Sequence, residues 1–240
     1  TNFILTYNLG DINRMVRYDN INGTPLSSLT VDIPQGSPPI LQIRWLTAPF
    51  AVDPSAKYLY PYSQIQMSET SIGVIPANTA VGEIFSNNYQ LSAIPSRMYI
   101  FARAQNNTQG SFDTDSYLYI ENISVDFCNQ VGVFSNYTPA MLYNQLMVKN
   151  GWQHSFPITS QFLGSVLAID FGQDFPLPEG KAVGVQGQEQ IQVKVRVRNL
   201  SGSNINASLY LVPVYDGVFV VDNGSTSTVT NILNERDALS

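Results

Sequence analysis

The chain has 240 residues, of which 44% are hydrophobic and only 12% are charged, and its formal net charge is −6. The few cations form no dense cluster that would neutralise phosphates, which disfavours direct nucleic-acid binding, and no run of about 18 apolar residues predicts a membrane span. A polar but weakly charged surface suits extensive contact with other copies, because few ions must be dehydrated when an interface forms.

Short apolar runs bounded by Gly, Pro, Asn and Ser predict strands from the beginning of the chain onwards. The chain starts at Thr1 and enters the first run at once, so we expect that a segment upstream is missing. In chain order the predicted strands cover residues 3–7, 29–33, 40–45, 58–67, 98–102, 117–127, 166–171, 190–199 and 209–221.

Three of these runs carry more detailed expectations. In 117–127 the apolar parity changes, which predicts a β-bulge near Glu121 or Asn122. In 190–199 valines alternate with cations, so we expect Val195 in the core and Arg196 in water. Pro213 predicts an edge or bulged position, because proline cannot donate to a strand ladder.

One helix is predicted, over residues 139–149. Thr138 is the expected N-cap, Pro139 occupies the first turn, and Asn150 with Gly151 marks the end. Leu142 and Leu146 lie four residues apart on one face, so the helix is expected as a short lid or connector against the strands.

The pattern as a whole predicts an all-β fold, an antiparallel β-sandwich of the jelly-roll kind. Many strands are separated by turn residues, and helical spacing is nearly absent elsewhere. We divide the chain into a jelly-roll domain over 1–222 and a C-terminal arm over 223–240, where strand alternation is lost.

Residues that could carry chemistry are few. His154 is the only histidine, so a triad or a zinc site would have to be built on it. Cys128 is expected as a buried small side chain, because no neighbour in the sequence would lower the pKa of its thiol. Trp45 and Trp152 would be the sugar-stacking residues of a lectin, but core packing is the expected role.

Two pairs of carboxylates are also candidates. Asp113 and Asp115 offer oxygens for Ca²⁺, yet a turn before a strand is the favoured interpretation. Asp170 and Asp174 would suit a glycosidase only at a controlled separation, which sequence does not establish. We therefore assign no catalytic, cofactor-binding or metal site and expect that the protein is not an enzyme.

The order of several segments resembles a known family of viral proteins. These are LSAIPSRMYIFAR at 91–103, IENISVDF at 120–127, MLY at 141–143, VKNG at 148–151 and LGSVLAIDFGQD at 163–174, followed by the strand at 190–199. Together they resemble the major capsid proteins of virophages, polinton-like viruses and Polinton elements, the double jelly-roll lineage. The match is to the C-terminal jelly roll of such proteins.

The resemblance implies a structural function in an icosahedral virion assembled inside the host cell. Three subunits, each with two jelly rolls, would form a pseudo-hexagonal capsomer. The implied partners are other copies, other capsid proteins and the N-terminal jelly roll of the same subunit, with no cofactor, no direct nucleic acid and no membrane span. A carbohydrate- or receptor-binding jelly roll is the alternative, and a β-sandwich hydrolase using Asp170, Asp174 or His154 ranks below it.

Overall fold

Eleven strands make up most of the regular structure in the described part of the chain. The computed structural model describes residues 57–105, 117–174, 176–185, 187, 189–222 and 225–230. The predicted strands at 3–7, 29–33 and 40–45 lie outside these residues, as do Trp45, Asp113 and Asp115. The strands are β1 (Tyr58–Ile65), β2 (Ser68–Ile75), β3 (Ala80–Phe85), β4 (Tyr89–Gln90), β5 (Arg97–Ala104), β6 (Tyr119–Phe127), β7 (Gln130–Val133), β8 (Val166–Asp170), β9 (Gln190–Arg198), β10 (Ile205–Asp222) and β11 (Ser225–Thr230).

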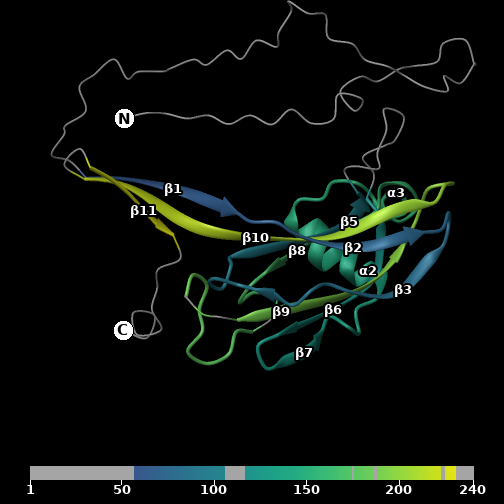
Figure 1. Ribbon diagram of the computed structural model, residues 1–240, viewed down its shortest axis with the longest axis horizontal. Helices are drawn as coiled ribbons and strands as arrows, with labels where there is room; N and C mark the ends of the chain where they lie inside the picture. The colour runs from purple at the N-terminus through teal and green to yellow at the C-terminus, as the bar shows by residue number, and fades with distance from the viewer. Residues whose placement is uncertain are drawn as a thin grey trace, which may run out of the picture. The chain divides into compact units, whose positions relative to one another are not determined.

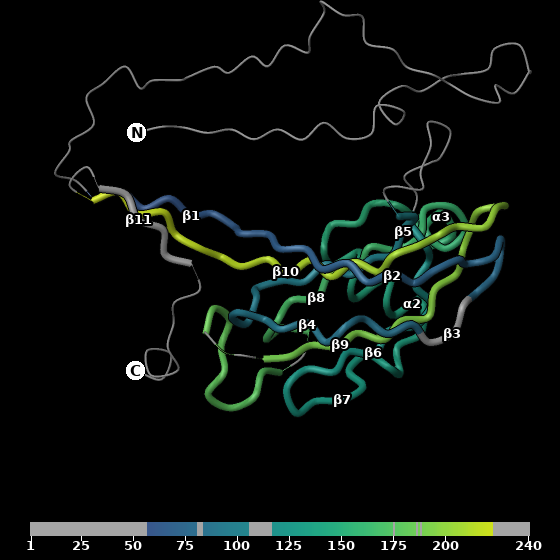
Figure 2. Tube along the Cα trace, viewed as in Figure 1, coloured from purple at the N-terminus to yellow at the C-terminus, as the bar shows by residue number. Residues whose placement is uncertain are grey.

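The strands form two antiparallel sheets in two layers (Figure 1). One sheet has six strands: β1, β10, β5 and β8 follow in this order, and β2 and β11 also pair with β10. The other has five: β3, β9, β6 and β7 follow in order, and β4 also pairs with β9. The trace in Figure 2 shows β9, β6 and β7 on one side of the molecule and β10 with β2 on the other. The predicted all-β antiparallel sandwich is confirmed.

The hydrophobic core lies between the two sheets, and β9 contributes four side chains to it. The inward side chains of β9 are at most 1% exposed: Ile191, Val193, Val195 and Val197. Ile100 of β5 and Leu209 of β10 belong to the same buried cluster on the opposite sheet. Arg196 and Arg198 are exposed, so the predicted orientation of this strand is correct.

β6 contains the predicted bulge. Its register against β9 shifts between Ile120 and Asn122, which leaves Glu121 as the extra residue. The bulge allows Ile120 and Ile123 both to be buried although they differ in parity. Apolar residues on both sides of Glu121 therefore reach the same core.

β10 is a central strand with neighbours on both sides. β2 and then β1 pair along one side of it, and β5 and then β11 along the other. Pro213, predicted at an edge or bulge, lies within this strand opposite Met98 of β5, so that prediction is wrong. The proline is tolerated because its nitrogen and carbonyl point to the side of β10 where β2 ends and β1 begins, so no strand needs an N–H from it there. Its carbonyl accepts the N–H of Gln66, in the turn between β1 and β2, at 3.2 Å.

β1, residues 214–222 of β10, and β11 form a three-stranded extension that we call the ribbon. β11 lies inside 223–240, the segment predicted as an arm without strand alternation. Its sequence STSTVT has no apolar alternation, and it becomes a strand by pairing with residues 217–222 of β10. Residues 231–240 of the predicted arm lie outside the described part.

The predicted helix is present and changes type along its length. α2 (Pro139–Leu142) continues as a π-helical turn (Tyr143–Met147) and a 3₁₀ turn (Val148–Asn150). The Thr138 hydroxyl accepts the N–H of Met141 at 3.4 Å, and Gly151 ends the run with a φ of 91°. Leu142 and Leu146 are 1% and 0% exposed, so this run packs on the sandwich as expected.

A second helical run was not predicted. α3 (Phe156–Ile158) continues as a π-helical turn (Thr159–Leu163), too short to show a helical period in the sequence. The Trp152 indole N–H donates to the Thr159 hydroxyl at 2.8 Å, and the Tyr143 hydroxyl donates to the His154 carbonyl at 2.7 Å. These bonds tie the two runs together, and we call residues 139–163 the helical segment.

Candidate functional site

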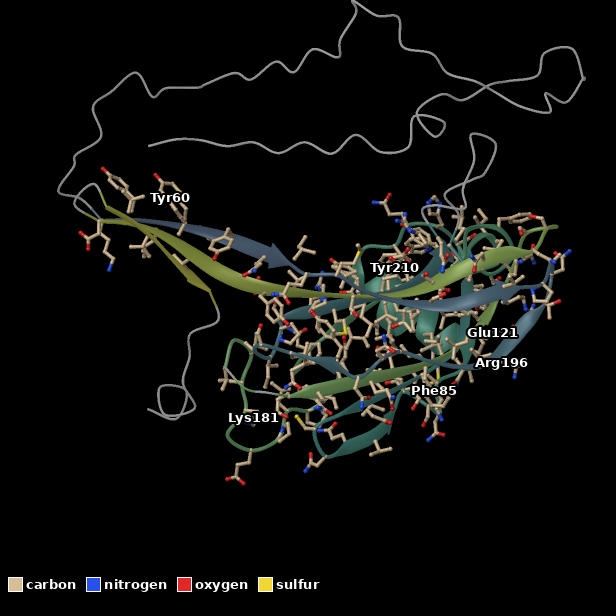
Figure 3. All side chains as sticks on the ribbon, in the orientation of Figure 1. Tyr60, Phe85, Glu121, Lys181, Arg196 and Tyr210 are labelled. Atoms are coloured by element: carbon tan, nitrogen blue, oxygen red, sulfur yellow. The ribbon has the colours of Figure 1, made fainter. Side chains whose placement is uncertain are left out.

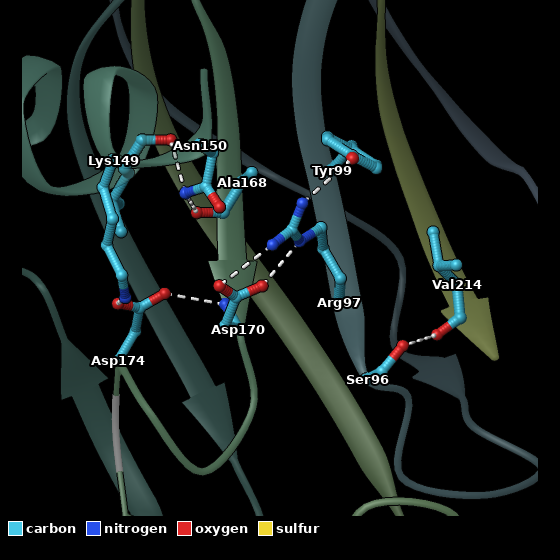
Figure 4. Close-up of polar contacts among 10 residues, drawn as sticks. Ser96, Arg97, Tyr99, Lys149, Asn150, Ala168, Asp170, Asp174 and Val214 are labelled. Carbon is cyan, nitrogen blue, oxygen red and sulfur yellow. Dashed lines mark hydrogen bonds and ion pairs between the residues drawn. The ribbon is translucent and has the colours of Figure 1, made fainter. Parts of the chain in front are cut away.

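Polar side chains meet where β5 begins and β8 ends. Arg97 and Asp170 lie opposite each other in this antiparallel pair. The Arg97 guanidinium donates to both carboxylate oxygens of Asp170, at 2.6 and 3.1 Å (Figure 4). This bidentate hydrogen bonding to Asp170 raises the pKa of Arg97 above its ordinary value, so the guanidinium stays charged at any accessible pH.

Asp174 extends this network to the helical segment. One carboxylate oxygen accepts the backbone N–H of Asp170 at 2.7 Å, and the other pairs with the Lys149 ammonium at 2.5 Å. The neighbouring Asn150 donates to the carbonyl of Ala168 in β8 at 3.1 Å. Charged and neutral hydrogen bonds therefore hold the helical segment against the end of β8 (Figure 4).

These contacts bring Asp170 and Asp174 together and indicate a structural role for both carboxylates, not a catalytic one. A glycosidase needs one carboxyl group as acid and a second as nucleophile or base, both facing the substrate. Here each carboxylate already contacts a cation, and one oxygen of Asp174 also accepts the backbone N–H of Asp170. Both side chains are thus committed to binding β8, β5 and the helical segment to one another.

A groove of about 550 Å³ lies beside the Arg97–Asp170 pair. Tyr99 and Phe171 line it on the sandwich side, and Ser63 and Asp216 line it at the base of the ribbon. The Ser63 hydroxyl donates to the Asp216 carboxylate at 3.3 Å. The groove is thus a polar junction between sandwich and ribbon.

His154 and Trp152 both lie in the helical segment. His154 is exposed, and its ring contacts Trp152 edge-on with centroids 5.6 Å apart. Trp152 is half-buried, packs against the hydrophobic core and uses its N–H within the segment. Trp152 therefore has the core-packing role that the sequence favoured over sugar stacking.

Cys128 lies in a different environment from the one that the sequence predicts. It was expected to be buried, but it is exposed in the turn between β6 and β7, with a φ of 54°. Its thiol donates to the Glu189 carboxylate at 3.0 Å, and Lys181 pairs with the other oxygen of that carboxylate at 3.0 Å. Partial desolvation and this carboxylate raise the pKa of Cys128 to about 12, so the thiol is protonated and unreactive at neutral pH.

The cations of β9 lie on the outer face of the five-stranded sheet. Arg196 and Arg198 both pair with Glu121 of the β6 bulge, the former at 3.1 Å. Lys194 lies over the Phe85 ring, 4.8 Å from its centroid. Figure 3 shows Glu121, Arg196 and Phe85 close to one another on this layer. The two arginines share one carboxylate, which fits the predicted solvent face of a strand.

Neither a metal-binding cluster nor a membrane-spanning helix is found in the part of the chain that the structure describes. Within it, no three His, Cys, Asp or Glu side chains gather as a metal ion would require. Nor does any helix there have the length and apolar character that crossing a bilayer demands.

Comparisons with known proteins point to viral shells. The family model described as major capsid protein V20 C-terminal domain matches residues 60–217. Capsid protein V20 of Sputnik virophage is 24% identical over an aligned length of 264 residues. The alignment covers 99% of this chain and 44% of that protein.

Two solved structures share the fold, which is therefore a capsid jelly roll. The cryo-EM structure of the Sputnik virophage matches with a TM-score of 0.70 and 23% identity, over 80% of this chain and 42% of the other. The crystal structure of the mavirus major capsid protein matches with a TM-score of 0.64 and 14% identity, over 76% and 43%. The chain thus spans less than half the length of each of these relatives.

Proposed function

Because this chain belongs to the family of the major capsid protein V20 C-terminal domain, we propose that it is a structural wall element of a virophage-type capsid and acts in the virion. The observation that carries the proposal is the family match over 60–217, which covers nearly the whole sandwich from β1 into β10. The resemblance found in the sequence points the same way.

The finer proposal is that the chain is the C-terminal jelly roll of a double jelly-roll subunit. Its partners would then be the N-terminal jelly roll, two further subunits in a trimeric pseudo-hexagonal capsomer, and other capsid proteins. The low charge supports this role, because interfaces between copies can form without stripping many ions of water. We place the domain boundary at the end of β10, with β11 as the first part of the arm over 223–240.

We also propose that the protein is not an enzyme and does not bind nucleic acid directly. The carboxylates best suited to hydrolysis, Asp170 and Asp174, are held in ion pairs. Arg196 and Arg198 of β9 share Glu121 instead of forming an unpaired basic surface. The paired carboxylates do not favour catalysis, and the paired arginines do not favour binding to a phosphate backbone.

Light scattering on the complete subunit, with both jelly rolls, tests the capsid proposal. A trimer or a larger assembly is expected, because a shell grows from repeated interfaces between identical copies. A stable monomer at every salt concentration would contradict it.

A further inference from the structure

The ribbon extends beyond the sandwich. At its base Tyr215 is buried, whereas Leu59 and Tyr60 further along β1 are exposed within the described part of the chain. β10 has 18 residues, and a strand of this length spans about 60 Å. Beyond residue 214 it pairs only with β1 and β11. In Figure 1 this part lies past the end of the five-stranded sheet, and Figure 3 shows Tyr60 there, away from the sandwich.

Both faces of the ribbon carry apolar side chains. Residues opposite each other in a strand pair share a face, so Tyr60 lies beside Phe219 on one face and Leu59 beside Val220 on the other. Leu59 and Tyr60 are 60% and 55% exposed. β1 has no charged residue, and 214–222 contains only Asp216 and Asp222. Contiguous apolar surface of this kind marks a contact site.

The ribbon is suited to packing by its faces. Among the described strands β1 pairs only with β10, and Pro61 within it lacks the N–H that a further strand would need. β1 pairs with β10 over eight residues and β11 pairs with it over six, which gives each face of the ribbon an area of roughly 360 Å². A partner that packs on one face would bury roughly 360 Å² of the ribbon, less than half of the ~800 Å² that each partner buries in a standard interface, so this contact is one small part of a larger assembly.

A second group of exposed apolar side chains lies in the helical segment. Met141, Val148, Ile158 and Phe162 are 42% to 67% exposed. With Leu59, Tyr60, Ile65 and Met67 of the ribbon and the turn after it, they are eight of the eleven exposed large hydrophobic residues of the described part. In Figure 1 α2 and α3 lie at the opposite end of the molecule from β11.

We propose that the ribbon of one copy packs on the helical segment of the next copy, an inference that rests on the proposed capsid function. A closed ring with an odd number of subunits needs two different contact surfaces on each copy, and these two meet that condition. Residues 139–163 contain one charged residue, Lys149, which is already paired with Asp174. Copies with a net charge of −6 therefore meet here without close like charges.

Disulfide trapping in the complete subunit tests this contact. In a Cys128→Ser background, one tagged copy carries Leu59→Cys and a co-expressed copy with another tag carries Phe162→Cys. Mixed-tag product is expected about tenfold above that of a matched control, because disulfides form only across short distances. The control replaces Phe162→Cys by Val131→Cys in β7, where Val131 is 81% exposed. Equal yields, or a dominant product between two Leu59→Cys copies, would overturn the inference.

Light scattering separates the failure of this contact from the failure of the capsid function. The double variant Leu59→Thr with Tyr60→Thr keeps strand propensity and is expected to raise the concentration for half-assembly about tenfold at an unchanged melting temperature. If wild type and double variant assemble alike, the ribbon contact is wrong and the capsid function stands. If wild-type subunits stay monomeric, both are wrong.

Discussion

The ring of Tyr62 in β1 lies against the backbone of Gly217 in β10. The two residues are opposite each other, and a Cβ on Gly217 would stand 2.7 Å from Cζ and 2.8 Å from Cε1 of the ring. Glycine is needed here because it leaves room for the ring. The pair gives the ribbon a cross-strand contact that does not depend on the sandwich core.

Gly217→Ala is expected to displace the Tyr62 ring and weaken the ribbon locally, by about 1 kcal/mol. Hydrogen exchange should therefore speed up at the amides of β1 and the outer part of β10, while β9 keeps its protection. Gly202→Ala is the matched control, since a Cβ there meets no atom within 4 Å. If Gly217→Ala costs as much in a Tyr62→Ser background as in wild type, the ring contact is not the cause.

Val195→Asp should destabilise the fold by about 3 kcal/mol or more, because it places an unpaired carboxylate at a position only 1% exposed. A substitution of the neighbouring residue, Arg196, is the control. Arg196→Ser removes an ion pair at an exposed side chain, and Glu121 keeps Arg198, so a loss below about 0.5 kcal/mol is expected. Thermal melts showing equal losses for the two variants would contradict the orientation of β9.

The sequence predicted those elements whose signal is local. Val195 lies in an alternating run, Glu121 lies where the parity changes, and Thr138 precedes a proline and an apolar pair, so β9, the bulge and the helix were all expected. β11 escaped prediction because its polar sequence becomes a strand only through its partner β10. Pro213 misled because its tolerance depends on the change of partner strand beside it.

The polar network could not be predicted for a related reason. Arg97 and Asp170 are 73 residues apart in sequence, and Lys149 and Asp174 are 25 apart. Nothing near Arg97 in the sequence indicates its partner. Only the pairing of β5 with β8 brings the two ends together. Leu59 and Tyr60 lie in a run that predicts a strand, and its pattern alone does not distinguish an exposed strand from a buried one.

Gly164→Ala is expected to cost about 3 kcal/mol or more, among the largest effects of any single glycine substitution. Gly164 has a φ of 77°, and a Cβ there would stand 2.8 Å from the carbonyl oxygen of Leu118 and closer still to that of Tyr117. Both contacts are to backbone, which does not move aside as a side chain would. Gly151 has a similar φ of 91° with no atom within 4 Å, so Gly151→Ala should cost only about 1 kcal/mol. Similar urea midpoints for both variants would show that the close approach is absent.

Alkylation of Cys128 should respond in opposite directions to its two charged neighbours. Burial around the sulfur, then Glu189, raises the pKa of Cys128 to about 12, whereas Lys181 lowers it. At pH 8 Glu189→Gln should therefore speed iodoacetamide modification about tenfold by increasing the thiolate fraction, and Lys181→Gln should not speed it. A rate that rises in both variants would mean that exposure alone controls the reaction.

The same shift sets a pH dependence of stability. In the folded chain the pKa of Cys128 is about 12, against an ordinary value of 9.0 for a free thiol. Between these values the folded state holds a proton that the unfolded state has lost, so this contribution to stability is complete below pH 9 and falls as the pH rises towards 12. Urea titrations at pH 8 and pH 10.5 should show a larger alkaline loss for wild type than for Cys128→Ser. Equal losses would indicate that the folded and unfolded thiols titrate alike.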